Sequence, residues 1–170
     1  MENKTAFVNC NTDGKYAPVS ADRAPLCAFV YDSITRMFNA EEYFVCSKSV
    51  NEQTLYGILD SLGREVVPCV MDAVEEFTYN YAEIAKDGKF GVLTAEGCFV
   101  EPVFDEADPY GEFLRVCKDG IWGFLDVRGN FIYEADVSQA GSGELLSYWM
   151  PNRYMREMLE SDIANACERG

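Results

Sequence analysis

Residues 86–93 read KDGKFGVL, and this stretch decides the fold because it returns further along the chain. Residues 118–125 read KDGIWGFL, and residues 55–59, LYGIL, match the second half of both stretches. The three aromatic–Gly pairs are therefore 34 and then 32 residues apart. Self-similarity at such a period is the signature of a repeat architecture, in which each unit buries its apolar face against the next.

The positions downstream of each aromatic–Gly pair keep their spacing. A fourth, degraded copy lies upstream at residues 13–17, DGKYA, where Ala17 replaces the glycine and Arg23 stands six residues further on. Terminal repeats are often atypical, because they cap the stack. The recurring residues are Gly63, Gly97 and Gly129 at plus six; Val66, Val100 and Ile132 at plus nine; Pro68, Pro102 and then Glu134 at plus eleven; and Asp72 with Phe77 and Asp105 with Tyr110 beyond them.

Each unit is predicted to contain a tight β-hairpin. Asp-Gly between alternating apolar runs is a strong hairpin signal, because both central residues of a type I′ turn need positive φ. The spacing predicts that residues 81–86 pair with 89–93 about Asp87-Gly88. It likewise predicts that residues 113–118 pair with 121–125 about Asp119-Gly120.

A second turn, at each plus-six glycine, is predicted to return the chain into a third strand. Because proline has no N–H to give to a ladder, we expect Pro68 and Pro102 to end these strands. The acidic stretches that follow are expected to be solvated loops at the unit boundaries. The predicted third strands are residues 65–67, 99–101 and 130–132.

Glycine inside a strand weakens it and therefore needs a cause. Either the backbone bulges there, or a neighbouring aromatic ring lies flat across the missing side chain. Both explanations make Gly57, Gly91 and Gly123 structural.

The pairs Tyr56-Gly57, Phe90-Gly91 and Trp122-Gly123, with Gly-x-x-Val/Ile and Pro after them, are similar to the repeats of the bacterial WG-repeat family. The similarity covers residues 17–134, and only the third pair has the Trp-Gly that names the family. The resemblance implies an all-β array of short antiparallel strands, usually assigned to binding. It carries over no catalytic residues.

We therefore predict an all-β fold, an antiparallel β-hairpin repeat array with one C-terminal α-helix. The β-repeat domain is predicted at residues 1–137, with a linker rich in small residues at 138–150 and the helix at 151–168. The predicted units are residues 17–56, 57–90, 91–122 and 123–134.

The helix is predicted because Pro151 suits a first turn and apolar residues recur after it at helical spacing. This helix either caps the last unit or is offered to a groove on a partner, with Tyr148 and Trp149 as aromatic anchors. The recurring apolar residues are Met155, Leu159, Ile163 and Ala166.

The composition is that of a globular protein. Of the 170 residues, 48% are hydrophobic and 14% aromatic, which supplies enough apolar surface for a core. We expect no membrane insertion, because no run approaches the roughly 20 apolar residues that span a bilayer, and no signal-peptide core follows Met1. The seven cysteines are an odd number without close pairs, which favours reduced thiols in the cytoplasm.

Charge is the unusual bulk property. The net charge is −15, and residues 51–130 hold 16 acidic and 6 basic residues. Such a chain repels phosphate backbones, so we expect no direct binding of nucleic acid.

Known catalytic patterns are missing from the sequence. The chain has no histidine, which removes the usual general base, the usual metal ligand and every Ser-His or Cys-His arrangement. No phosphate-binding glycine motif occurs, so we expect no cofactor and no metal, and we expect that the protein is not an enzyme. Cys69, Cys98 and Cys117 fall in predicted strands and are interpreted as small core residues.

Three functions are compatible with these patterns. The first is a non-catalytic protein-interaction module with an acidic surface that attracts a basic protein. The second is an acidic inhibitor or DNA mimic, similar to anti-CRISPR proteins, that blocks a nucleic-acid-binding enzyme. The third is a hydrolase that uses carboxylate pairs such as Glu101 and Asp105. The predicted partner-binding residues are Asp72, Glu75, Glu76, Asp105, Glu106, Asp108, Glu112, Tyr148 and Trp149.

Overall fold

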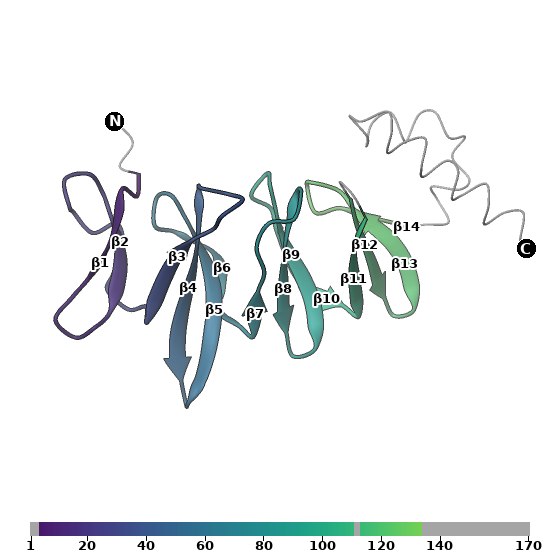
Figure 1. Ribbon diagram of the computed structural model, residues 1–170. Coiled ribbons are helices and arrows are strands. Elements are labelled where there is room, and N and C mark those ends of the chain that lie inside the picture. Colours follow the sequence, from purple (N-terminus) through teal and green to yellow (C-terminus); the bar gives the residue numbers. More distant parts are fainter. Residues whose placement is uncertain (1–3, 111–112, 134–170) are drawn as a thin grey trace, which may run out of the picture.

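The computed structural model describes residues 4–110 and 113–133, and strands are the only regular secondary structure of this part. Its fourteen strands form four antiparallel sheets that follow one another along the molecule (Figure 1). The predicted all-β antiparallel fold is confirmed. The predicted linker at 138–150 and helix at 151–168 lie outside the described residues.

Each sheet is a meander in which strands lie side by side in chain order. Sheet 1 has two strands, and sheets 2, 3 and 4 have four each. The strands are β1 (Phe7–Cys10) and β2 (Tyr16–Val19) in sheet 1; β3 (Ser33–Arg36), β4 (Tyr43–Val50), β5 (Gln53–Asp60) and β6 (Glu65–Met71) in sheet 2; β7 (Ala73–Val74), β8 (Tyr81–Lys86), β9 (Lys89–Thr94) and β10 (Phe99–Phe104) in sheet 3; and β11 (Glu106–Tyr110), β12 (Phe113–Lys118), β13 (Ile121–Leu125) and β14 (Phe131–Tyr133) in sheet 4.

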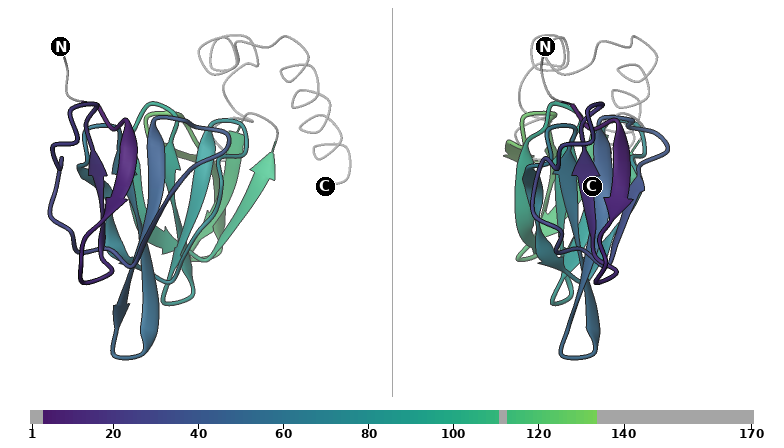
Figure 2. Two further views of the ribbon diagram at one scale, coloured as in Figure 1. Left: turned by 60° about the vertical axis from the view of Figure 1, so that its left-hand side comes forward. Right: turned by 90° about the vertical axis from the view of Figure 1, so that its left-hand side faces the viewer.

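The sheets stack into an open array. Sheets 1 and 4 lie at opposite ends in Figure 1, and the end view of Figure 2 places the sheets one behind another. Sheets 2, 3 and 4 begin directly after Asp32, Asp72 and Asp105. The sheets therefore repeat with the period of the sequence. The aromatic–Gly pairs lie in the second strand of each central hairpin, so units that begin at these pairs do not coincide with the sheets.

The predicted central hairpins are confirmed. Residues 81–86 pair with 89–94, and residues 113–118 pair with 121–125. Both residues of each turn have positive φ, 51° and 73° at Asp87-Gly88 and 53° and 78° at Asp119-Gly120. This is the left-handed backbone that a type I′ turn requires.

The plus-six glycines also turn the chain as predicted. Gly63 has φ of 78°, and its N–H donates to the Asp60 carbonyl at 3.0 Å. Arg23 occupies the same place in the degraded copy, with φ of 62° and its N–H donating to Ser20 at 2.9 Å. The degraded copy therefore keeps the turn but has a side chain where the other copies have none.

Replacing Arg23 by glycine is expected to stabilise the protein. A left-handed backbone costs a non-glycine residue about 1–2 kcal/mol, and the extra freedom of glycine in the unfolded chain offsets part of this. We expect the free energy of unfolding in urea to rise by roughly 0.5–1 kcal/mol. Arg23→Ala, which keeps the strain, is the control. An Arg23→Gly variant no more stable than Arg23→Ala would contradict the assignment.

The expectation that the prolines end the third strands is wrong. Strand β6 continues past Pro68 to Met71, and β10 continues past Pro102 to Phe104. Both prolines lie where the register shifts: in sheet 2 the pairing advances from residue 67 to 71 on β6 but only from 58 to 56 on β5. A bulge at a sheet edge tolerates a residue without an N–H, so the strand resumes beyond it.

The same bulges explain two of the strand glycines, Gly57 and Gly91. A Cβ on Gly57 would lie 2.7 Å from the Cys69 Cα, and one on Gly91 would lie 2.4 Å from the Val100 carbonyl oxygen. The backbone of the bulged neighbour, rather than an aromatic ring, therefore fills the space of the missing side chain. A bulge was one of the two explanations, but it lies in the strand opposite each glycine rather than at the glycine itself.

The prediction that the acidic stretch after Asp105 is a loop is wrong, because this stretch forms strand β11. It pairs with β12 along its whole length, from Glu106 opposite Cys117 to Tyr110 opposite Phe113. As the first strand of sheet 4, β11 pairs with one neighbour only. Charged residues and proline are common on such edge strands, where they discourage pairing with other chains. Its acidic composition therefore did not prevent a strand.

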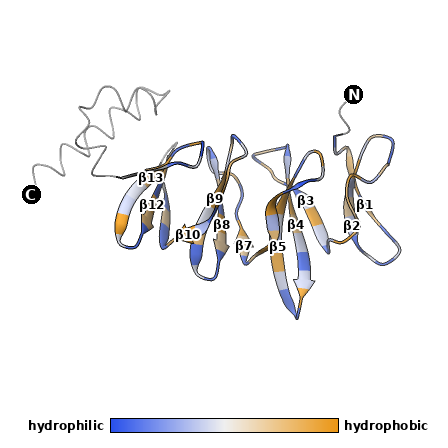
Figure 3. Cartoon of the chain, turned by 180° about the vertical axis from the view of Figure 1, so that it is seen from behind, coloured by the Kyte–Doolittle hydropathy of each residue, from blue (hydrophilic) through white to orange (hydrophobic). Residues whose placement is uncertain are grey.

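The apolar core lies between the sheets. Neighbouring residues of one strand face opposite junctions: Ile58 packs against sheet 3 and Leu59 toward sheet 1, and Leu93 and Val92 divide in the same way around sheet 3. Figure 3 shows hydrophobic segments along these stacked strands. Each inner sheet thus buries both faces, so the units depend on one another.

Candidate interaction surface

The aspartate that opens each sheet ties two units together. The Asp72 carboxylate accepts hydrogen bonds from the Asp87 N–H at 2.7 Å and from Gln53 Nε2 at 3.2 Å. Gln53 follows the hairpin turn of sheet 2, and Asp87 begins the hairpin turn of sheet 3. One carboxylate therefore satisfies a turn N–H in its own unit and holds a side chain of the preceding unit.

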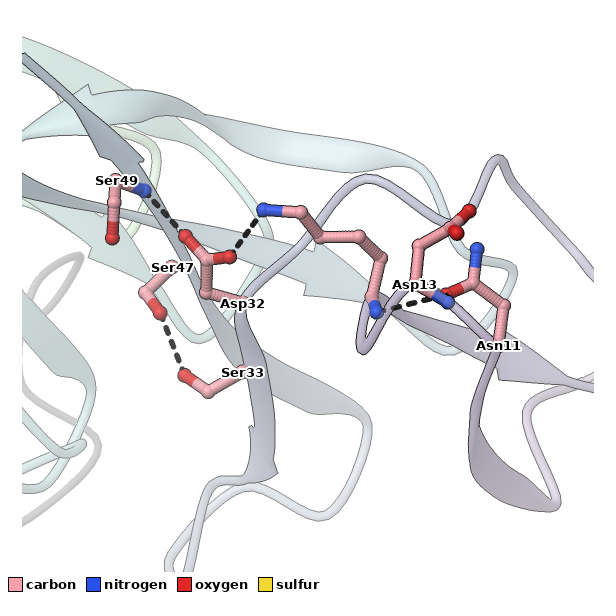
Figure 4. A network of polar contacts seen from close by, with 7 residues as sticks. Asn11, Asp13, Asp32, Ser33, Ser47 and Ser49 are labelled. Atoms are coloured by element: carbon pink, nitrogen blue, oxygen red, sulfur yellow. Dashed lines mark hydrogen bonds and ion pairs between the residues drawn. The ribbon is translucent and has the colours of Figure 1, made fainter.

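The arrangement recurs at the other two boundaries. Asp32 accepts hydrogen bonds from Lys15 Nζ and the Ser49 N–H, and Figure 4 shows it between Ser49 and the turn that holds Asn11 and Asp13. The Lys15 hydrogen bond is the main cause that lowers the Asp32 pKa to about 2. Asp105 accepts from Lys89 Nζ and from the Asp119 N–H at 2.8 Å, and the Lys89 hydrogen bond lowers its pKa as well.

Three of the predicted partner-binding residues therefore form hydrogen bonds within the protein. Asp72 and Asp105 bind the hairpin turns, as described. Glu76 is exposed, but its Oε2 accepts the Phe38 N–H at 2.9 Å and so joins the loops before β4 and β8. These three side chains lie at the unit boundaries, where they hold the array together.

Three other predicted residues are exposed on the side of the array formed by the first strands of the sheets. Glu75 follows β7, and Glu106 and Asp108 lie on β11. Within residues 4–110 and 113–133, no hydrogen bond or ion pair engages their carboxylates. They differ in this respect from Asp72, Asp105 and Glu76.

A fourth carboxylate, Glu83 of β8, was not among the predicted residues. Glu83 is half-buried, and its carbonyl accepts the Glu75 N–H at 2.9 Å. Burial raises the pKa of the Glu83 carboxyl, and the negative charges of Glu75 and Asp108 raise it further. The structure thus brings carboxylates of sheets 3 and 4 within electrostatic reach of one another. We call Glu75, Glu83, Glu106 and Asp108 the acidic edge.

The remaining predicted residues lie elsewhere. Glu112 falls in the gap between the two described segments, and Tyr148 and Trp149 lie beyond residue 133, so all three are outside the described residues.

The three cysteines interpreted as core residues differ in their positions. Cys69 of β6 and Cys117 of β12 are buried, as predicted, whereas Cys98 lies in the turn before β10 rather than in a strand and is half-buried. Cys69 Sγ reaches across Gly57 and donates to the Leu55 carbonyl at 3.4 Å. In the described segments, no three Cys, Asp or Glu side chains are grouped so that they could hold a metal ion.

The carboxylate pair considered for hydrolysis has an unsuitable member. A general acid needs a raised pKa, but the Lys89 hydrogen bond lowers the pKa of Asp105. The Asp105 carboxylate is also bound on its second oxygen by the Asp119 N–H. Its environment is that of an ion pair that supports a turn.

A polar network around the buried Tyr31, beside sheet 2, was also missed. Tyr31 Oη and Lys48 Nζ donate to the same Glu65 oxygen, at 2.6 and 2.8 Å, and the Lys48 ammonium lies 4.5 Å from the centre of the Tyr31 ring. Among the side chains that the structure describes, this trio is seen in this unit alone, so the repeat pattern could not predict it. The network joins the segment before β3 to β4 and β6.

Within the described residues, no helix has the length and apolarity needed to cross a membrane. Neither the curated proteins nor the solved structures contain a match to this chain. The model of the family described as "WG containing repeat" matches residues 56–90, which run from the Tyr56-Gly57 pair in β5 to Phe90 in β9. The resemblance seen in the sequence is thereby confirmed for residues 56–90, which match one WG-containing repeat.

Proposed function

We propose that the chain is a non-catalytic interaction module whose acidic edge binds a basic protein. The supporting observation is the environment of Glu83, a half-buried carboxylate beside the like charges of Glu75 and Asp108. Burial and repulsion both make this arrangement unfavourable for the folded chain. A cation supplied by a partner would relieve both effects.

Edge protection accounts for only part of the acidic edge. Charge and proline on β11 discourage strand pairing, which gives Glu106 and Asp108 a role without any partner. Glu83, however, lies on β8, whose neighbours β7 and β9 are both present. An inner strand needs no protection, and carboxylates whose pKa is shifted by burial and by neighbouring charges are found at functional sites more often than elsewhere. Glu83 therefore favours binding over solubility as the reason for the charge.

The rigid array gives such an edge two useful properties. Carboxylates on successive sheets keep their spacing, because each sheet is held to its neighbours by the core and by the boundary aspartates. A negative net charge of 15 also attracts a basic partner from a distance and speeds association. Binding of this kind weakens with added salt.

The proposal is tested by affinity capture with the full chain and two charge-matched variants. Glu75→Gln, Glu106→Gln and Asp108→Asn together remove three of the four carboxylates of the acidic edge, while Asp22→Asn, Glu96→Gln and Glu101→Gln remove three exposed charges elsewhere. We expect the wild type and the second variant to capture the same basic protein from the cells that express the chain. Capture should fail with the first variant and in high salt.

Equal capture by both variants, or capture that survives high salt, would refute a role for the acidic edge. If the captured protein binds nucleic acid, competition with duplex DNA distinguishes the inhibitor alternative. A DNA mimic and DNA exclude each other from one site, whereas an ordinary partner can hold both.

Replacing Glu83 by glutamine is expected to stabilise the free protein at neutral pH. Because folding raises the Glu83 pKa above its ordinary value of 4.5, wild-type stability falls as pH rises through the folded-state pKa. The variant lacks this loss, so its Tm at pH 7 should be higher by roughly 1–3 °C, with the difference vanishing below about pH 4. Glu96→Gln, exposed in a turn, is the control. A Glu83→Gln variant less stable than the wild type at pH 7 would show that the carboxylate stabilises the fold.

A further inference from the structure

The most exposed large hydrophobic side chains in the described segments are two aromatic residues on neighbouring loops. Phe38 is 87% exposed and Tyr79 is 69% exposed. Phe38 lies in the loop before β4, and Tyr79 lies in the loop before β8, which is the corresponding loop of the next unit. Neither ring contributes to the three core clusters between the sheets.

The two loops are fixed against each other. The Phe38 N–H donates to Glu76 Oε2, and Asn39 Nδ2 donates to the Phe77 carbonyl, both at 2.9 Å. Beneath them the Tyr43 and Phe77 rings stack, with centroids 5.6 Å apart and planes 19° from parallel. The exposed rings therefore project from one supported surface made by residues 37–42 and 75–80.

Tyr79 is kept in an unfavourable backbone conformation. It has φ of 56° at the first central position of a two-residue turn, in which Thr78 N–H donates to the Tyr81 carbonyl at 2.9 Å. Glycine is strongly preferred at a turn position with positive φ, and a bulky residue there is an outlier. Because the ring is exposed, burial does not compensate for the strain. Strain of this kind collects at binding sites.

The residues around these rings are acidic and favour a positively charged ligand. The surface of residues 37–42 and 75–80 contains four carboxylates, Glu41, Glu42, Glu75 and Glu76.

 Residues 37–47 and 65–85 contain no basic residue at all, and Arg64 lies outside both ranges, paired with Asp60. An aromatic face beside carboxylates suits a guanidinium, which stacks on the ring and hydrogen-bonds to the carboxylate.

The part of the chain that the structure describes already contains an example of this combination. The Arg36 guanidinium lies 5.2 Å from the centre of the Phe44 ring and 4.0 Å from the Glu41 carboxylate. We propose that the surface of residues 37–42 and 75–80 binds arginine side chains of an extended basic segment in the partner, with Phe38 and Tyr79 as the stacking rings. This inference rests on the proposed function and names the chemistry that its partner presents.

The test uses the full chain and a fluorescently labelled peptide of four Arg-Gly repeats, with fluorescence anisotropy as the measurement. A cation–π contact at an exposed site is worth roughly two- to five-fold in affinity, so Phe38→Ala and Tyr79→Gly should each weaken binding by about that factor. Phe7→Ala removes another exposed ring, on β1, and should leave the affinity unchanged. A peptide of four Lys-Gly repeats should bind more weakly than the arginine peptide.

Tyr79→Gly carries a second readout that separates binding from folding. Because it relieves the strained turn, its Tm should be higher than that of the wild type by roughly 2–4 °C while its affinity is lower. Lower affinity together with a lower Tm, unchanged affinity in both aromatic variants, or no saturable binding of the arginine peptide would each overturn the inference. If only the variant of Glu75, Glu106 and Asp108 loses peptide binding, the aromatic surface is refuted and the acidic edge stands.

Discussion

Gly91→Ala is expected to destabilise the protein by about 3 kcal/mol or more, measured as the free energy of unfolding in urea. The added Cβ would lie 2.4 Å from the Val100 carbonyl oxygen, 2.7 Å from the Pro102 nitrogen and 2.8 Å from the Glu101 carbonyl carbon. All three are backbone atoms of the bulged strand β10, which cannot move away without breaking its pairing with β9. The cost is therefore overpacking against backbone.

Gly88→Ala is the matched control for this prediction. A Cβ on Gly88 meets nothing within 4 Å, but φ there is 73°. Its cost should come from the left-handed backbone alone, about 1 kcal/mol. If Gly91→Ala were no more destabilising than Gly88→Ala, the close approach of β10 would not be the reason for the aromatic–Gly pair.

Ile84→Ala is expected to cost about 3–4 kcal/mol and to leave a single unfolding transition. Ile84 is fully buried at the junction of sheets 2 and 3, where its side chain packs in the cluster that includes Ile58 and Leu93. Removing it leaves a cavity shared by two units, so both lose stability together.

Val70→Ala, on the exposed side of β6, is the control and should change stability by less than about 0.5 kcal/mol. Two separate transitions in Ile84→Ala, with one at the wild-type midpoint, would show that the sheets fold independently. That result would contradict an array in which each unit needs its neighbour.

The central hairpins could be predicted from sequence because their cause is local. Asp87-Gly88 and Asp119-Gly120 each specify a turn that joins two alternating strands, and the period places the copies in order. The predicted strand ends at Pro68 and Pro102 were wrong. A residue without an N–H interrupts a strand only where its N–H would have to donate to the neighbouring strand. At a bulge no such hydrogen bond is needed. The bulge in turn depends on a glycine in the neighbouring strand, which the local sequence around the proline does not show.

The candidate site was predicted only in part. The sequence shows which residues are charged, but not which of their carboxylates form hydrogen bonds or ion pairs within the protein. Asp72 and Asp105 look like surface acids, yet their carboxylates satisfy turn N–H groups that are themselves consequences of the hairpins. Glu83 sits in an alternating strand and gives no signal until the fold brings Asp108 near it. The exposure of Phe38 and Tyr79 is likewise a property of the loops, which the repeat pattern does not describe.

The most direct test is an NMR titration of the isotope-labelled full chain with the arginine peptide, following the backbone amide signals. The account predicts saturable shifts in residues 37–42 and 75–80 and along β11, which stop when Glu75, Glu106 and Asp108 are neutralised. Shifts confined to the opposite edge, on β6 and β10, or no shifts at all, would contradict it.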